Sequence, residues 1–328
     1  MARRALFIFS FLFTAAAVIA AIALWGHSRF TAPGPLVGEM AVIIPHGAGF
    51  DAIAGQLTGA GVLADPLVFR IGARISGADK GLRAGEYMFT ARISAEQALA
   101  LLKSGKTVVR RLTVAEGLTV RQVVDQLQAT EGLSGEIGRW FAEGSLLPET
   151  YHFSYGDLRL DVLKRMNGAM SQTLTRLWGR RLPGLPLKTP AEALILASMV
   201  EKETAIPEER ARIAGVFMNR LGRGMRLQSD PTVSYGLTLG AGPLGRALSR
   251  ADLAIPTPYN TYLIDGLPPG PISNPGRQAL AAVMRPLETD ELYFVADGAG
   301  GHVFARTLKE HNRNAAKWRK LRKDSAAK

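Results

Sequence analysis

The chain has 328 residues, of which 47% are apolar and 21% are charged, so it can form two or three compact domains, and extensive disorder is excluded. The absence of cysteine excludes disulfides, thiolate metal sites and cysteine nucleophiles. The net charge of +12 comes without a nucleic-acid recognition motif, so we expect no nucleic acid as a partner.

The beginning of the chain predicts a single membrane anchor. Two arginines precede an uncharged run of twenty residues, Leu6 to Trp25, and a helix of that length rises about 30 Å, the thickness of the hydrocarbon core. Positive charge on the short N-terminal side predicts residues 1–5 as a cytoplasmic stub and residues 6–25 as a transmembrane helix, with everything after Arg29 outside. A cleaved signal peptide is the alternative, although its apolar region usually has only about 7–15 residues.

Beyond a predicted linker at residues 26–37, one strand–turn–helix pattern occurs twice, seventy residues apart. The aligned pairs are Gly47 with Gly117, Ile53 with Val123, Gln56 with Gln126 and Leu57 with Leu127. Such self-similarity indicates an internal repeat of one supersecondary unit.

We predict a first module at residues 38–106, an intermediate α+β segment at 107–182 and a C-terminal domain at 183–328. The first module resembles LysM-like glycan-binding modules, in which a strand–helix–helix–strand unit grips N-acetylated sugars. A plain α+β spacer domain is the alternative. The basic tail from Lys309 onward is expected to be a solvated helix, or else a surface that attracts anionic lipid or an acidic wall polymer.

The densest polar cluster follows a helix that is apolar nearly all round, Ala191 to Val200, and is therefore expected to be buried. The helix ends in Glu201-Lys202-Glu203-Thr204. Desolvation raises the pKa of a carboxyl group, and a partly protonated glutamate is what a general acid needs. Residues i and i+2 lie about 200° apart on a helix, so spacing does not choose between the two glutamates. The alternative is a solvated helix end in which both are paired with Lys202 or Arg210.

A long irregular stretch, residues 222–275, is rich in glycine, proline, asparagine and tyrosine, and so long a loop is usually functional. Amide, hydroxyl, carboxyl and phenol groups in and before it suit the recognition of acetamido and hydroxyl groups. The predicted substrate-binding residues are Asn219, Gln228, Ser229, Asp230, Thr232, Tyr235, Asn260 and Tyr262. Turn formation and ordinary core packing are the alternative roles for these residues.

No cofactor or metal is expected. His302 and His311 are nine residues apart and lack a carboxylate at ligand spacing, which favours surface histidines over metal ligands. The sequence also contains no phosphate-binding glycine loop and no serine nucleophile elbow.

Six blocks of sequence resemble the endolytic murein transglycosylase family, also called YceG-like. They occupy residues 196–204, 216–221, 224–236, 257–262, 266–272 and 293–297 and stand in the family's order, and the likeness covers the whole chain. It implies an α+β protein with an N-terminal transmembrane helix, a LysM-like α/β module and a C-terminal α+β catalytic domain. One departure is Leu146-Leu147, where the family often has an aromatic residue, so a sugar-stacking contact is in doubt there.

The resemblance also implies the chemistry. The family cleaves the glycosidic bond between N-acetylmuramate and N-acetylglucosamine in nascent peptidoglycan, leaves 1,6-anhydro ends and thereby limits strand length. The catalytic glutamate of the family directly precedes a threonine, which corresponds to Glu203 here. This residue would protonate the leaving oxygen and then take the proton of the C6 hydroxyl, a lyase reaction without water. Substrate-assisted glycosidases need no second carboxylate, and none of fixed spacing is evident.

The partners that follow are peptidoglycan strands, the membrane and, from resemblance alone, a peptidoglycan synthase. A non-catalytic, membrane-anchored glycan-binding scaffold is the main alternative, and it would tolerate the loss of Glu203. A soluble lyase of another type is a further alternative, because relatives have carried an aminodeoxychorismate lyase label. The predicted export anchor argues against that cytosolic chemistry.

Overall fold

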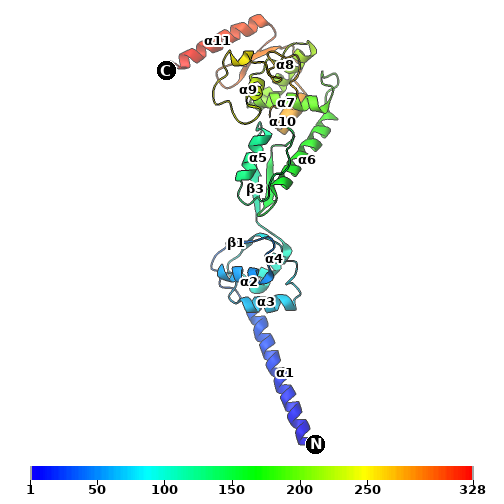
Figure 1. Cartoon of the computed structure of the whole chain (residues 1–328), viewed down its shortest axis with the longest axis vertical. Helices are drawn as coiled ribbons and strands as arrows, with labels where there is room; N and C mark the ends of the chain where they lie inside the picture. The colour runs from blue at the N-terminus through cyan, green and yellow to red at the C-terminus, as the bar shows by residue number, and fades with distance from the viewer. Residues whose placement is uncertain (1, 327–328) are drawn as a thin grey trace. The chain divides into compact units, whose positions relative to one another are not determined.

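The computed structural model describes residues 2–326 and, for side chains, residues 6–322. The chain divides into two compact units. Unit 1 comprises residues 1–110, 132–134 and 152–157, and unit 2 comprises residues 111–131, 135–151 and 158–328. Most of the predicted intermediate segment therefore belongs to unit 2. Figure 1 labels the elements along the chain.

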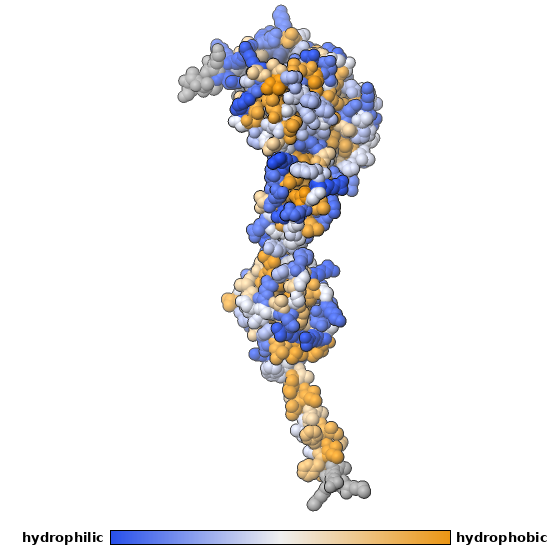
Figure 2. Space-filling view, viewed as in Figure 1, coloured by the Kyte–Doolittle hydropathy of each residue, from blue (hydrophilic) through white to orange (hydrophobic). Residues whose placement is uncertain are grey.

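The first helix, α1 (Ala2–Thr31), is long and apolar enough over Leu6–Thr31 to cross a membrane, and none of its most apolar window is buried. Figure 2 shows apolar surface along the length of this helix. The helix continues past Trp25, where the predicted span ended. Phe30 and Leu36 pack into the core of unit 1, so part of the predicted linker at 26–37 belongs to the folded unit.

Unit 1 is built around an antiparallel pair of strands, β1 (Met40–Ile44) and β2 (Gly85–Phe89), in which Val42 lies opposite Tyr87. Two helices connect the strands, α2 (Phe50–Gly59) and α3 (Pro66–Ile75), and α4 (Ala95–Ser104) follows them. The order is therefore strand–helix–helix–strand. Its core includes fully buried side chains from the strands and from the helices, among them Ile44, Leu57, Phe69, Tyr87 and Leu102.

The next elements belong mainly to unit 2. The strands β3 (Val109–Thr113) and β4 (Thr150–Ser154) pair with each other, and α5 (Val120–Ala129) lies between them in the chain. The helical part consists of α6 (Arg159–Trp178), α7 (Pro190–Glu203), η1 (Pro207–Glu209), α8 (Arg210–Gly222), α9 (Asp230–Thr238), η2 (Asp252–Ala254) and α10 (Arg277–Met284). An antiparallel hairpin, β5 (Tyr293–Ala296) and β6 (His302–Ala305), precedes the basic helix α11 (Leu308–Ala326).

The internal repeat is confirmed. In the first copy, the side-chain amide of Gln56 donates to the carbonyl oxygen of Ile43 at 2.5 Å, and in the second, Gln126 donates to that of Thr113 at 2.9 Å. The turn glycine between strand and helix has a φ of 77° in both copies. The same local pattern thus ties helix to strand in the same way seventy residues apart.

The core of unit 2 forms around α7, as its apolar sequence predicted. Thr189 caps the helix by accepting from the backbone N–H of Glu192, and Pro190 follows at the first helical position, where its missing N–H costs nothing. The side chains from Leu196 to Val200 are fully buried, and α6, α8 and α10 pack around them. Leu146 and Leu147 are also fully buried, so this position is part of the core and offers no surface to a sugar.

Candidate active site

Glu203 is the last residue of α7 and faces a cavity of about 400 Å³. The cavity walls come from α8, from the loop before α9, from the β5–β6 hairpin and from α11. The other lining residues are Arg220, Leu227, Gln228, Asp230, Tyr262, Phe294, Val295, Ala296, His302, His311 and Trp318. A carboxyl group at the end of a buried helix thus reaches a cavity large enough for a small ligand.

The two glutamates at the end of α7 have different surroundings. The side chain of Glu201 is 4% exposed, accepts from Arg210 at 3.3 Å and accepts from the backbone N–H of Gly276 at 2.8 Å. Its carboxylate is therefore occupied inside the protein. From sequence, either glutamate could have paired with Arg210. Glu201 does so, whereas Glu203 faces the cavity.

The carboxyl group of Glu203 is held by a short hydrogen bond from the hydroxyl of Ser229. Burial raises the pKa of Glu203 to about 7; the Ser229 hydrogen bond opposes this rise, nearby Asp230 adds to it, and His302 opposes it. A carboxyl group with a pKa near neutral is partly protonated at working pH. Glu203 can therefore donate a proton and take one back.

The loop that carries Ser229 is held from several sides. The buried guanidinium of Arg220 donates to the carbonyl oxygens of Arg226 and Leu227, both at 2.9 Å. The backbone N–H of Ser229 donates to the hydroxyl of Thr261 at 2.9 Å, and the hydroxyl of Thr232 donates to the carbonyl oxygen of Ser229 at 2.6 Å. These contacts place the Ser229 hydroxyl against the Glu203 carboxyl.

Four of the predicted binding residues gather around Glu203. Ser229 contacts it, and Gln228, Asp230 and Tyr262 line the same cavity. The phenol of Tyr262 donates to the Asp230 carboxylate at 2.6 Å. Gln228 has a φ of 51°, a backbone conformation unusual for a non-glycine residue and often found at functional sites.

The other four lie elsewhere. The amide of Asn219 donates to the carbonyl oxygens of Thr289 and Glu291 at 2.6 and 3.0 Å. Asn260 is fully buried and donates to two backbone carbonyls of the preceding loop, and Thr232 is buried beneath Ser229. Tyr235 lines a separate cavity.

Sequence reasoning missed a histidine–glutamate pair at the cavity. His302 was expected on the surface, but its side chain is only 14% exposed, and its Nδ1 lies 2.7 Å from a carboxylate oxygen of Glu209. Glu209 also accepts from the hydroxyl of Thr204 at 3.0 Å, next to Glu203. His311 and Trp318 of α11 line the cavity as well. Only the hairpin motif at 293–297 signalled that this distant segment belongs to the site.

A metal site was not expected from the sequence. Within the part of the chain that the structure describes, no group of three or more histidine, aspartate or glutamate side chains could hold a metal ion.

Comparison with known proteins gives consistent matches. A model described as the YceG-like family matches residues 42–317. An endolytic murein transglycosylase of Bacillus subtilis is 32% identical over 84% of this chain and 83% of its own length. One from Streptococcus pneumoniae is 33% identical over 83% of this chain but only 57% of its own length. A crystal structure of a yceG-like protein from Listeria monocytogenes, 28% identical, superposes with a TM-score of 0.52 and covers 84% of this chain and 99% of that one.

Proposed function

This chain belongs to the YceG-like family, and from that premise we infer that it is a peptidoglycan-cleaving lytic transglycosylase whose reacting group is the carboxyl of Glu203. The relatives with that activity in their names align with more than four fifths of the chain. The observation that carries the assignment to Glu203 is its position: it opens into a cavity with a pKa raised to about 7 by burial, whereas Glu201 is held by Arg210.

The reaction needs one group that first gives and then takes a proton. The protonated carboxyl of Glu203 donates its proton to the glycosidic oxygen as that oxygen leaves C1 of N-acetylmuramate. The resulting carboxylate then takes the proton of the C6 hydroxyl, and the C6 oxygen closes onto C1 as a 1,6-anhydro ring. The hydroxyl of Ser229 holds the carboxyl and stabilises its charged form between the two transfers. No water is consumed.

Other residues of the cavity are suited to hold the sugar. The Tyr262–Asp230 pair and the amide of Gln228 can exchange hydrogen bonds with hydroxyl and acetamido groups. The indole of Trp318 offers an aromatic face. Leu146 and Leu147, where the family often has an aromatic residue, are buried, so we assign sugar stacking to Trp318 instead.

Mass spectrometry of products tests this function. The purified protein is incubated with glycan strands, and new 1,6-anhydro ends are expected with the wild-type chain and not with Glu203→Gln. The amide keeps the shape of the side chain but cannot transfer a proton. Binding of strands without any new anhydro end by the wild-type protein would instead favour the non-catalytic scaffold.

Unit 1 is proposed as a LysM-like glycan-binding module. The support is its strand–helix–helix–strand order, β1-α2-α3-β2, around a core of its own. A fragment of residues 29–110, which keeps Phe30 in that core, should co-sediment with intact sacculi. A folded fragment that stays in solution would make this module a spacer.

The proposed location is the cell inner membrane, with α1 as a single-pass anchor and both units on the periplasmic side. The support is the apolar stretch Leu6–Thr31 and the arginines before it. A reporter fused to the C-terminus should be active only if it requires export, and activity of a cytoplasmic reporter would reverse the orientation. A peptidoglycan synthase as partner rests on the family resemblance alone.

A further inference from the structure

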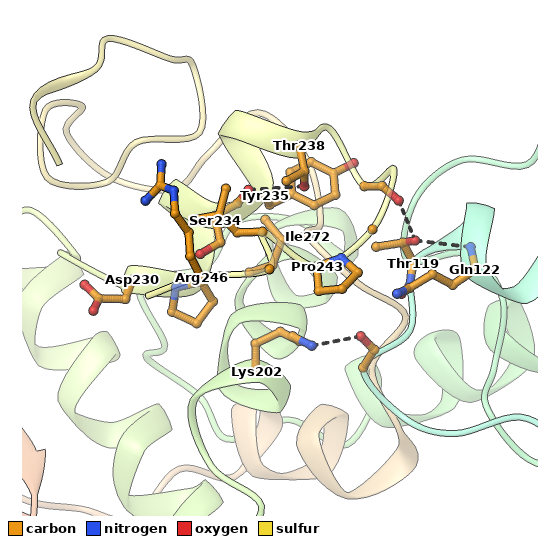
Figure 3. A pocket seen from close by; sticks show the side chains of 16 residues that line it. Thr119, Gln122, Lys202, Asp230, Ser234, Tyr235, Thr238, Pro243, Arg246 and Ile272 are labelled. Carbon is orange, nitrogen blue, oxygen red and sulfur yellow. Dashed lines mark hydrogen bonds between the residues drawn. The ribbon is translucent and has the colours of Figure 1, made fainter. Parts of the chain in front are cut away.

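A second cavity, of about 420 Å³, lies next to the Glu203 cavity within unit 2. Its walls come from the start of α5, the end of α7, helix α9 and the loop at 240–246 (Figure 3). Asp230 lines both cavities, so they meet at the first residue of α9. A ligand longer than one sugar could therefore occupy both.

Lys202 lines the second cavity and belongs to α7, the helix that ends in Glu203. It directly precedes Glu203 on α7, and successive residues of a helix point about 100° apart, so the two side chains enter different cavities. The ammonium group of Lys202 donates to the carbonyl oxygen of Gly117 at 3.2 Å, as Figure 3 shows. No carboxylate pairs with it among residues 6–322, and its side chain is exposed. Lys202 is thus a cation without an ion-pair partner among these residues, and the carboxylate that shares the cavity, Asp230, accepts from Tyr262.

The other cation of this cavity is already neutralised. The guanidinium of Arg246 donates to both carboxylate oxygens of Asp252, at 2.6 and 2.9 Å. Such bidentate pairs are strong and fix the geometry of the arginine. Lys202 is therefore the group with charge to offer to a ligand.

The remaining wall suits a sugar. The Gln122 side chain accepts from the N–H of Thr119 through its carbonyl oxygen, which leaves its amide N–H groups for a ligand. Tyr235 packs its ring against Tyr259, with centroids 4.8 Å apart, and presents an aromatic wall to the cavity. The cavity thus combines hydrogen-bond donors, an aromatic face and the unpaired ammonium of Lys202, beside the Asp230 carboxylate that it shares with the Glu203 cavity.

We propose that this second cavity is a subsite for the peptidoglycan strand next to the scissile bond, in which Lys202 binds a free carboxylate of the stem peptide. The inference rests on the proposed function. A strand cut internally must extend beyond the reacting sugar, and its neighbouring units carry peptides with carboxylates. A cavity of this size lies within the range of about 300–1,000 Å³ found for small-ligand sites, and an unpaired ammonium beside it selects anionic groups.

The test compares two substrates and two variants. Glycan strands that carry stem peptides and strands stripped of peptides by an amidase are cleaved by the full-length wild type, Lys202→Gln and Lys202→Arg. For Lys202→Gln, kcat/KM on peptide-bearing strands should fall about tenfold, the value of one charge-assisted hydrogen bond, and should change less than about twofold on stripped strands. Lys202→Arg should retain most of the activity on both. Lys188→Gln makes the same charge change two residues before α7 begins and should behave as wild type.

Other outcomes overturn the proposal. An equal loss of kcat/KM on both substrates would show that Lys202 has only a structural role, holding Gly117. No loss on either substrate would show that Lys202 does not bind the stem peptide. In both cases the wild type still produces anhydro ends, so the proposed function stands. Wild-type protein that produces none on either substrate would refute the proposed function, and this inference with it.

Discussion

The two copies of the strand–turn–helix unit have the same local structure and different surroundings at the turn. In the first copy, a Cβ added at Gly47 would meet nothing within 4 Å, and Gly49 caps α2 without a side-chain bond. In the second copy, the N–H of Gly117 donates to the carbonyl oxygen of Asn274 at 2.9 Å. The hydroxyl of Thr119 caps α5 and also donates to the carbonyl oxygen of Gly240 at 2.8 Å.

The difference shows how one supersecondary unit serves two purposes. The hydrogen bond from the glutamine of the helix to the strand is the same in both copies. In the second copy, the side chain at the helix cap, Thr119, binds the loop at 240–246, whereas the first copy has Gly49 at that position. The second copy has become a wall of the second cavity, whereas the first forms part of a unit with its own core.

The largest effect should come from the reacting group, which lies in the unit of the second copy. Glu203→Gln should lower the rate of anhydro-end formation by about 10⁴-fold, the upper end for loss of a general acid–base, because one residue serves both proton transfers. The fold should remain intact by circular dichroism. Mass spectrometry of the products measures the loss.

The control for this variant is Glu201→Gln. Since Glu201 is paired with Arg210 in the interior, we expect this change to lower Tm clearly and to lower kcat only slightly. An inactive Glu201→Gln beside an active Glu203→Gln would reverse the assignment, and full activity of both would show that neither glutamate is the reacting group.

The pH profile of activity should respond to two neighbours of Glu203 in opposite directions. Glu203 must start protonated, so kcat/KM should fall as the pH rises through about 7. Ser229→Ala removes a hydrogen bond that favours the charged form, so the fall should move to higher pH. Asp230→Asn removes a like charge, so the fall should move to lower pH. Shifts in the same direction in both variants would contradict this account.

Two equivalent helix caps sharpen the comparison of the units. Ser94 and Gln97 form a capping box on α4 in unit 1, and Thr119 and Gln122 form one on α5 in unit 2. Ser94→Ala and Thr119→Ala should each cost about 1 kcal/mol in the free energy of unfolding, as measured with denaturant. Only Thr119→Ala also releases Gly240, so it alone should lower kcat/KM, by roughly three- to tenfold. Equal kcat/KM of the two variants would show that α5 does not contribute to the substrate site.

The smallest effect is on stability. The folded pKa of Glu203, about 7, lies above its ordinary value of 4.5, so the folded state binds more protons than the unfolded state between these values. Stability then falls as the pH rises through this window. Glu203→Gln should therefore raise Tm at pH 8 and leave it unchanged at pH 4, measured by thermal denaturation. A gain that is independent of pH would indicate a packing effect.

The long apolar helix α1, the repeat and the buried helix α7 could be predicted from sequence because each depends on neighbours close in the chain. Twenty uncharged residues predict a helix long enough to cross a membrane, and the repeated glutamine and leucine positions specify how helix meets strand. The blocks around Glu203 also identified the family.

The composition of the site was decided by the tertiary structure. Spacing could not say which glutamate faces the cavity, because that depends on whether Arg210 packs against the helix end. Local sequence assigned Asn219, Thr232 and Asn260 to the substrate, but backbone carbonyl groups of the folded chain, near in sequence or far from it, occupy their hydrogen-bonding atoms. His302 and Trp318 reach Glu203 from about a hundred residues away. A polar side chain is available to a ligand only when packing leaves its hydrogen bonds unmet, and packing is set by the whole chain.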